Sequence, residues 1–153
     1  AGFDFAKESF EKIGMEYIKA YETAMFGCAL HAQARPRLKQ LQEKGKRQYI
    51  LSALFERDLR RIIEHFELSD YFTAVRGLSD QYANSKVELG RKLVRECGVD
   101  PARTLMIGDT LHDRETAQEL GIDCVLVAAG HNSHERLLQA GVPVYRSLGD
   151  LNV

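Results

Sequence analysis

The chain has 153 residues, of which 44% are hydrophobic and 28% are charged. This length suits one globular domain. The composition excludes a disordered chain, which would contain fewer apolar residues, and a collagen-like chain, which would have glycine at every third position. Lys and Arg (21) nearly balance Asp and Glu (22), so the formal net charge is −1. No overall field therefore favours nucleic acid or an anionic membrane, and an anionic ligand has to be bound locally.

The cysteines and apolar runs bear on location. Cys28, Cys97 and Cys124 lie far apart and form no C-x-x-C pair, which argues against a disulfide framework or a structural zinc site. We interpret all three as core residues and expect a cytoplasmic protein. No apolar run reaches the roughly 18 residues of a membrane span, and the charged residues 1–12 do not resemble a signal peptide.

The N-terminal part of the chain has helical rather than strand periodicity. Apolar residues recur at helical spacing within 5–26, and a shorter amphipathic stretch at 36–43 ends before Gly45. We expect two helices here and no strand. The chain contains no internal repeat, low-complexity segment or linker.

Beyond residue 47, short apolar runs alternate with amphipathic stretches. Strands are predicted at 48–53, 71–76, 104–108, 124–129 and 143–145, and helices at 55–66, 84–97, 112–120 and 133–139. Glycines follow three of these helices as stop signals, at positions 98, 121 and 141. Short apolar strands alternating with helices predict an α/β fold with a mostly parallel, buried sheet.

The strongest local signal for chemistry is the segment MIGDTLHD at 106–113. A strand delivers Asp109 at its carboxyl end, where ligands bind in open α/β sheets, and Asp113 follows one helical turn later. Two carboxylates placed in this way suit Mg²⁺, which takes one or two protein carboxylates together with water and phosphate. The structural alternative is that Asp109 caps the next helix and Asp113 is a solvated acid of its first turn.

Two further polar residues are expected at the same edge of the sheet. Ser52 ends the strand at 48–53, where its hydroxyl and the following backbone amides could hold a phosphoryl oxygen. A serine at this place is also a common helix cap. Lys86 lies near the start of the helix at 84–97, and because its charge opposes the helix dipole, we expect another group to hold it.

Two other patterns are interpreted as structural. His131 and His134 have i, i+3 spacing, but they flank a predicted helix start rather than a cluster of metal ligands. The basic residues between positions 35 and 47 are interpreted as a solvated helix face rather than a nucleic-acid patch.

In three of these segments the sequence resembles the haloacid dehalogenase superfamily, most closely its phosphoglycolate-phosphatase-like members. The family's motif II is a Ser or Thr after an apolar strand, matched by Ser52, and its motif III is a later lysine, matched by Lys86. Its motif IV is G-D-x-x-x-D, matched by Gly108, Asp109 and Asp113. The resemblance implies a three-layer, Rossmann-like parallel sheet.

The resemblance also implies a Mg²⁺-dependent phosphatase that acts on a small phosphorylated metabolite. In the family, an aspartate attacks the phosphorus and water then hydrolyses the aspartyl-phosphate. By carry-over, Asp109 and Asp113 hold Mg²⁺ directly or through water. Ser52 and Lys86 bind the phosphoryl group, and Lys86 and Asp109 are the catalytic residues present.

One part of the family pattern is missing. The nucleophile belongs to motif I, a D-x-D-x-T segment after the first strand, and Asp4 lacks both the second aspartate and the strand. In the family that strand lies between those carrying motifs II and IV, so we expect an opening in the middle of the sheet. We therefore expect a truncated, inactive chain in which 1–28 is the remnant of a helical cap and 29–153 forms the core.

Other interpretations stay open. The alternatives to the phosphatase are a non-catalytic phosphate- or metal-binding protein that has dispensed with motif I, and a related enzyme on the same fold such as a phosphomutase or a dehalogenase. The pair of Mg²⁺ ligands argues against a dehalogenase, which needs no metal. The alternative to a cap remnant is a free-standing pair of N-terminal helices. These motifs specify neither the substrate nor the oligomeric state.

Overall fold

The computed structural model describes residues 9–79 and 86–151. The chain divides into two compact units, Ala1–Leu30 and His31–Val153. The first contains helix α1 (Phe10–Ala24), whose N-cap Ser9 accepts a hydrogen bond from the Lys12 backbone N–H at 3.1 Å. The helix predicted at 5–26 is confirmed over these residues, and positions 5–8 lie outside the described part.

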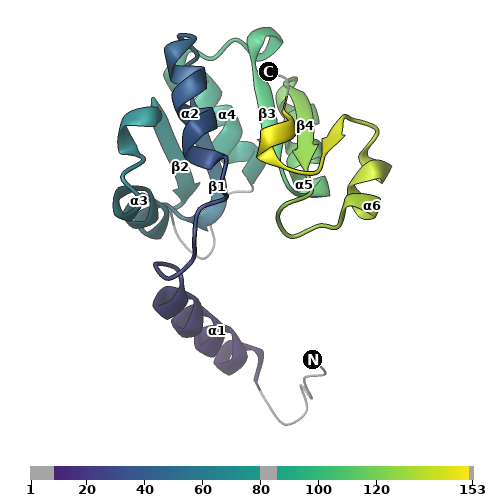
Figure 1. Ribbon diagram of the computed structural model, residues 1–153. Helices are drawn as coiled ribbons and strands as arrows, with labels where there is room; N and C mark the ends of the chain where they lie inside the picture. The colour runs from purple at the N-terminus through teal and green to yellow at the C-terminus, as the bar shows by residue number, and fades with distance from the viewer. Residues whose placement is uncertain (1–8, 80–85, 152–153) are drawn as a thin grey trace. The chain divides into compact units, whose positions relative to one another are not determined.

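The second unit alternates helices and strands as predicted (Figure 1). Its helices are α2 (Ala34–Glu43), α3 (Glu56–His65), α4 (Lys86–Cys97), α5 (Leu111–Leu120) and α6 (His134–Leu137). Its strands are β1 (Tyr49–Phe55), β2 (Ala74–Leu78), β3 (Leu105–Gly108), β4 (Asp123–Val127) and β5 (Val144–Tyr145). Short 3₁₀ turns include η1 (Ser69–Tyr71), η2 (Pro101–Arg103), η3 (Leu138–Ala140) and η4 (Leu148–Asp150). The α/β class is therefore confirmed.

The strands form two parallel sheets, one of β1 and β2 and one of β3, β4 and β5 in that order. Ile50 pairs with Val75 in the first sheet, and Gly108 pairs with Leu126 in the second. Among the described residues no strand lies between β1 and β3, so each of these strands has a single neighbour. This is the opening that the missing family motif predicts.

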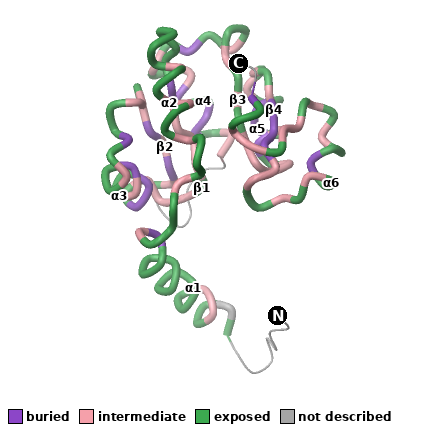
Figure 2. The backbone as a smooth tube through the Cα atoms, viewed as in Figure 1, coloured by how far each residue is buried: buried purple, intermediate pink, exposed green. Residues whose placement is uncertain are grey.

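Burial is most complete on β4, the one described strand with two neighbours, as Figure 2 shows by colour. The central strand β4 buries Val125, Leu126 and Val127, which are at most 7% exposed. On β3, Leu105 is 38% and Ile107 is 40% exposed, and every residue of β1 is half-buried or exposed. The prediction of a fully buried strand at 48–53 is wrong in this respect, because one edge of β1 is open.

Helix contacts hold the two sheets in one unit. Helix α4 packs on β1 and β2, and it also contacts α5, which packs on β3 and β4. A glycine lets α4 and α5 approach closely, because a Cβ on Gly90 would lie 2.5 Å from Leu120 Cδ1. The two sheets therefore share a covering layer although their strands do not pair.

Two arginines of α2 make a second connection. Arg35 donates to the carbonyl of Glu67 at 3.2 Å, just beyond the end of α3. Arg37 donates through Nε to the carbonyl of Leu148 at 3.1 Å and through a terminal nitrogen to the carbonyl of Gly149. Helix α2 thus binds main chain on the β1–β2 side and main chain of η4. Within the basic stretch at 35–47, these two side chains have a structural role.

The cysteines differ in exposure. Cys28 is exposed, whereas Cys97 and Cys124 are half-buried. The interpretation of all three as core residues is therefore wrong for Cys28. None of the helices in the described ranges is long and apolar enough to cross a membrane.

Candidate functional site

The acidic motif lies where β3 passes into α5. Asp109 follows the last residue of β3, and Thr110 is the N-cap of α5. The Thr110 hydroxyl accepts from the Asp113 N–H at 3.2 Å, and Asp113 Oδ2 accepts from the Thr110 N–H at 2.9 Å. Asp113 is thus the acid of a capping box. A side chain on Gly108 would overlap that of Asp113, so the glycine lets the carboxylate fold beneath the strand end.

Asp113 is buried and fully engaged. Its Oδ2 also accepts from the Asp109 N–H at 3.0 Å and the Thr110 hydroxyl at 2.7 Å. Its Oδ1 accepts from Lys86 Nζ at 2.5 Å, and the two side chains are only 7% and 14% exposed. The partner expected for Lys86 is therefore Asp113, and this acid is not the solvated residue of the structural alternative.

The ionisation of Asp113 follows from these contacts. Burial acts to raise the pKa of the Asp113 carboxyl, but the hydrogen bonds from Lys86 and Thr110 outweigh it. The pKa of Asp113 consequently lies below its usual value. The carboxylate is charged at neutral pH and forms a buried ion pair with Lys86.

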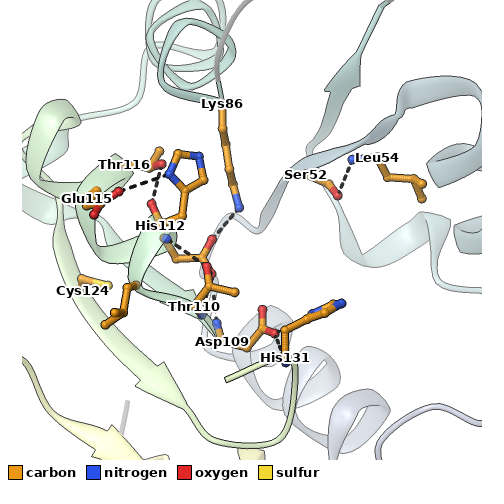
Figure 3. A network of polar contacts seen from close by, with 12 residues as sticks. Ser52, Leu54, Lys86, Asp109, Thr110, His112, Glu115, Thr116, Cys124 and His131 are labelled. Carbon is orange, nitrogen blue, oxygen red and sulfur yellow. Dashed lines mark hydrogen bonds and ion pairs between the residues drawn. The ribbon is translucent and has the colours of Figure 1, made fainter. Parts of the chain in front are cut away.

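Asp109 is more open and has a different partner, as Figure 3 shows. Its Oδ2 accepts from the His131 backbone N–H at 2.8 Å, and His131 Nδ1 lies 3.1 Å from the same oxygen. The Asp109 side chain is 40% exposed and that of His131 is 90% exposed. The other carboxylate oxygen of Asp109, Oδ1, has no hydrogen-bond partner among the described residues.

Ser52 lies on the other side of the opening between the sheets. Its hydroxyl accepts a hydrogen bond from the Leu54 N–H at 3.1 Å, two residues further along β1. In the part of the chain that the structure describes, Ser52 makes no hydrogen bond to Lys86 or to the acidic motif. Lys86, Asp109 and Asp113 are therefore brought together by hydrogen bonds, and Ser52 is not joined to them.

Side chains of α3 bind β2 near Ser52, where the pairing register of β1 and β2 shifts. Glu56 accepts from the Gly77 N–H at 3.2 Å and from Arg60 at 2.7 Å, and Arg60 donates to the Val75 carbonyl at 3.2 Å. Burial acts to raise the pKa of Glu56, but the Arg60 and Gly77 hydrogen bonds hold it below its usual value. These contacts fix the end of β1 beside β2.

The sequence motifs did not predict the contact of His131 with Asp109. A usable signal was present, because the turn at 130–131 follows β4, and β4 is the parallel neighbour of β3. The carboxyl ends of parallel neighbours meet at one edge of the sheet.

The donor set fits part of a Mg²⁺ site. Asp109 Oδ1 is a carboxylate oxygen left available for a cation, and Mg²⁺ commonly uses one or two such ligands. Both oxygens of Asp113 already accept protein hydrogen bonds, which suits contact through water better than direct ligation. Residues 9–79 and 86–151 contain no group of three or more His, Cys, Asp or Glu that could hold a metal.

Curated relatives match part of the chain. Tyrosine-protein kinase PtkA of Mycobacterium tuberculosis is 33% identical over 97 residues, which are 63% of this chain and 33% of the relative. A 5'-nucleotidase of Pseudomonas aeruginosa is 35% identical over 79 residues, 51% of this chain and 36% of the relative. The chain thus spans about a third of the length of these relatives.

Solved structures match more of it. A predicted phosphatase of Clostridium acetobutylicum has a TM-score of 0.82 at 25% identity, covering 90% of this chain and 66% of that one. The structure of M. tuberculosis protein tyrosine kinase A has a TM-score of 0.79 at 26% identity, covering 93% of this chain and 68% of that one. The model of the family described as haloacid dehalogenase-like hydrolase matches residues 4–127. The chain therefore belongs to the haloacid dehalogenase-like hydrolase family.

Proposed function

We propose that this chain supplies most of the core of a Mg²⁺-dependent phosphomonoester hydrolase of the phosphoglycolate-phosphatase-like kind. The observation that carries the proposal is the hydrogen-bonded set of Lys86, Asp113 and Asp109 at the carboxyl end of β3. The family match supports a small phosphorylated metabolite as the substrate. The free cysteines Cys28, Cys97 and Cys124 support a cytoplasmic location.

Each residue of the candidate site has a separate role in this proposal. Asp109 would hold Mg²⁺ directly, and Asp113 would hold it through water. Asp113 also keeps the ammonium of Lys86 in place. Lys86 then neutralises charge on the phosphoryl group, and the Ser52 hydroxyl binds one of its oxygens. Mg²⁺ held by these residues would supply further charge neutralisation for the transferring group.

The nucleophile comes from a strand that pairs with both open edges. Within residues 9–79 and 86–151, β1 and β3 each pair along one edge only, and Leu105 and Ile107 keep an exposure unusual for large apolar residues of a sheet. A parallel strand between them would cover these side chains. Its carboxyl end would lie beside Asp109, where an aspartate of a D-x-D-x-T segment can attack the phosphorus. Under this proposal, residues 1–28 are the remnant of a helical cap.

Hydrolysis of p-nitrophenyl phosphate tests the proposal. The 153-residue chain is expected to be inactive, and a form extended upstream to include the D-x-D-x-T strand is expected to show Mg²⁺-dependent turnover. Asp109→Asn should abolish that turnover, while Asp123→Asn, at an exposed position of β4, should not. Robust Mg²⁺-dependent turnover by the 153-residue chain alone would overturn the proposal.

A second candidate is phosphoryl transfer to protein tyrosine. It is favoured by the 33% identity with tyrosine-protein kinase PtkA and by the 26% identity with its structure. The same extended form, given ATP and a tyrosine peptide, distinguishes the two. Peptide phosphorylation without net hydrolysis of p-nitrophenyl phosphate would favour this second function.

A further inference from the structure

We infer that the turn of Gly130 and His131 orients the Asp109 carboxylate, holding Oδ2 and leaving Oδ1 directed to a cation. His131 is then a positioning residue. The inference rests on the proposed function only in that the cation is the Mg²⁺ of that site.

The first support is the convergence of two nitrogens on one oxygen. The His131 backbone N–H lies 2.8 Å from Asp109 Oδ2, and His131 Nδ1 lies 3.1 Å from it. A half-exposed carboxylate would otherwise rotate freely. Two contacts to the same oxygen fix its orientation and leave the second oxygen for a ligand.

The second support is the lack of space beside Gly130. A Cβ at this position would overlap Asp109 Oδ2, with the carboxylate carbon 2.5 Å away and Asp109 Cβ 2.7 Å away. The backbone of the turn therefore packs directly against the carboxylate. Any other residue at this position has to displace either the turn or the Asp109 side chain.

The third support is that the turn is anchored on both sides. Before it, the Ala128 N–H donates to the Tyr145 carbonyl at 2.8 Å, which ties it to β5. After it, the Asn132 side chain accepts from the Leu111 N–H at 3.3 Å, which ties it to the start of α5. The turn that carries the His131 N–H donor is thus attached to the same end of α5 that carries the acidic motif.

The contact itself can be tested without metal. In ¹H–¹⁵N spectra of the chain, the His131 amide is expected to shift upfield in Asp109→Asn, because a carboxylate acceptor becomes a neutral amide. The matched control Asp123→Asn should leave that resonance in place. A His131 amide that does not respond to Asp109→Asn overturns the inference and leaves the proposed function standing.

Binding of Mn²⁺, measured from the electron paramagnetic resonance of the free ion, tests the role toward metal. Gly130→Ala is expected to weaken binding at least about tenfold, the usual effect of removing a group that orients a metal ligand. His131→Ala keeps the backbone donor and is expected to weaken binding less, about threefold. His131→Asn should restore binding, because its amide nitrogen can replace Nδ1.

The controls are Gly14→Ala, whose added methyl meets nothing within 4 Å, and His134→Ala. Circular dichroism verifies folding, and His131 is exposed enough for its variants to fold even if Gly130→Ala does not. Parent-like binding by both His131→Ala and a folded Gly130→Ala overturns the inference alone. An equal loss in His134→Ala also overturns it, because an imidazole pair would then bind the ion. A parent that binds no better than Asp109→Asn overturns the metal role of the turn, whereas the proposed function is decided separately by hydrolysis with the extended form.

Discussion

Replacing Asp113 by asparagine should destabilise the fold mainly through Lys86. Asparagine has the same shape, and its carbonyl oxygen can still accept from the backbone N–H groups of Asp109 and Thr110. Its amide nitrogen, however, cannot accept from the ammonium. Lys86, which is 14% exposed, would keep a positive charge without its partner.

The magnitude follows from this burial. Removing one member of a buried ion pair costs about 3–5 kcal/mol of stability. Because Lys86 keeps some exposure, the expected loss is about 3 kcal/mol. That is a large share of the about 5–15 kcal/mol that stabilises a typical domain. Lys86→Met combined with Asp113→Asn removes the unpaired charge, so the double variant should be more stable than Asp113→Asn alone.

The same pair predicts a pH dependence. The pKa of Asp113 is lowered in the folded state, so its ionised form contributes stability above the pKa of an unfolded aspartate. This contribution disappears as the pH falls through the lowered pKa. The stability difference between the parent and Asp113→Asn should therefore be greatest near neutral pH and should narrow in acid.

Urea unfolding followed by far-UV circular dichroism measures the coupling free energy between Lys86 and Asp113. It is carried out on the parent, on Asp113→Asn, on Lys86→Met and on the double variant. A loss below about 1 kcal/mol for Asp113→Asn, or effects of the two substitutions that simply add, would refute the reasoning.

Three other predictions concern separate parts of the fold. Gly108→Ala should lower the free energy of unfolding by about 1–3 kcal/mol, because the new methyl overlaps Asp113; an unchanged urea midpoint would contradict this. Burial raises the pKa of Cys124 to about 11, so iodoacetamide at pH 8 should alkylate the exposed Cys28 first. Peptide mass spectrometry measures the two alkylation rates, and equal rates would contradict this prediction. Arg37→Ala should cost about 1–2 kcal/mol in urea, because two carbonyls of η4 lose their donor, and a neutral effect would show that water replaces it.

Most helices and strands could be placed from the sequence because local signals specify them. The strand predicted at 71–76 is displaced, since Ser69–Tyr71 forms η1 and β2 begins at Ala74. Gly98, Gly121 and Gly141 take φ values of 56°, 67° and 68°, the left-handed conformation expected of a helix stop. Glu67 adopts φ 52° after α3 without being glycine, and no sequence signal indicated it. Residues 84 and 85 of the predicted helix at 84–97 lie outside the described residues.

The degree of burial of each strand and the long-range contacts were harder to predict from the sequence. The apolar run of β1 predicts a strand, but how far it is buried depends on how many strands lie beside it. The acidic motif could be recognised because its residues are close in sequence. The contact of Asp109 with His131 joins positions 22 apart, and it depends on β3 and β4 being neighbours. The burial of Asp113 depends likewise on the meeting of α4 and α5.

The edges of β1 and β3 that no described strand covers also govern the colloidal behaviour of this chain. A strand edge with free N–H and C=O groups is a template for pairing with another molecule, and on β3 it adjoins the exposed side chains of Leu105 and Ile107. A net charge of −1 and a sequence pI of about 6.6 supply little electrostatic repulsion between molecules at neutral pH. The purified chain should therefore self-associate through these edges as its concentration rises, and most readily near its pI.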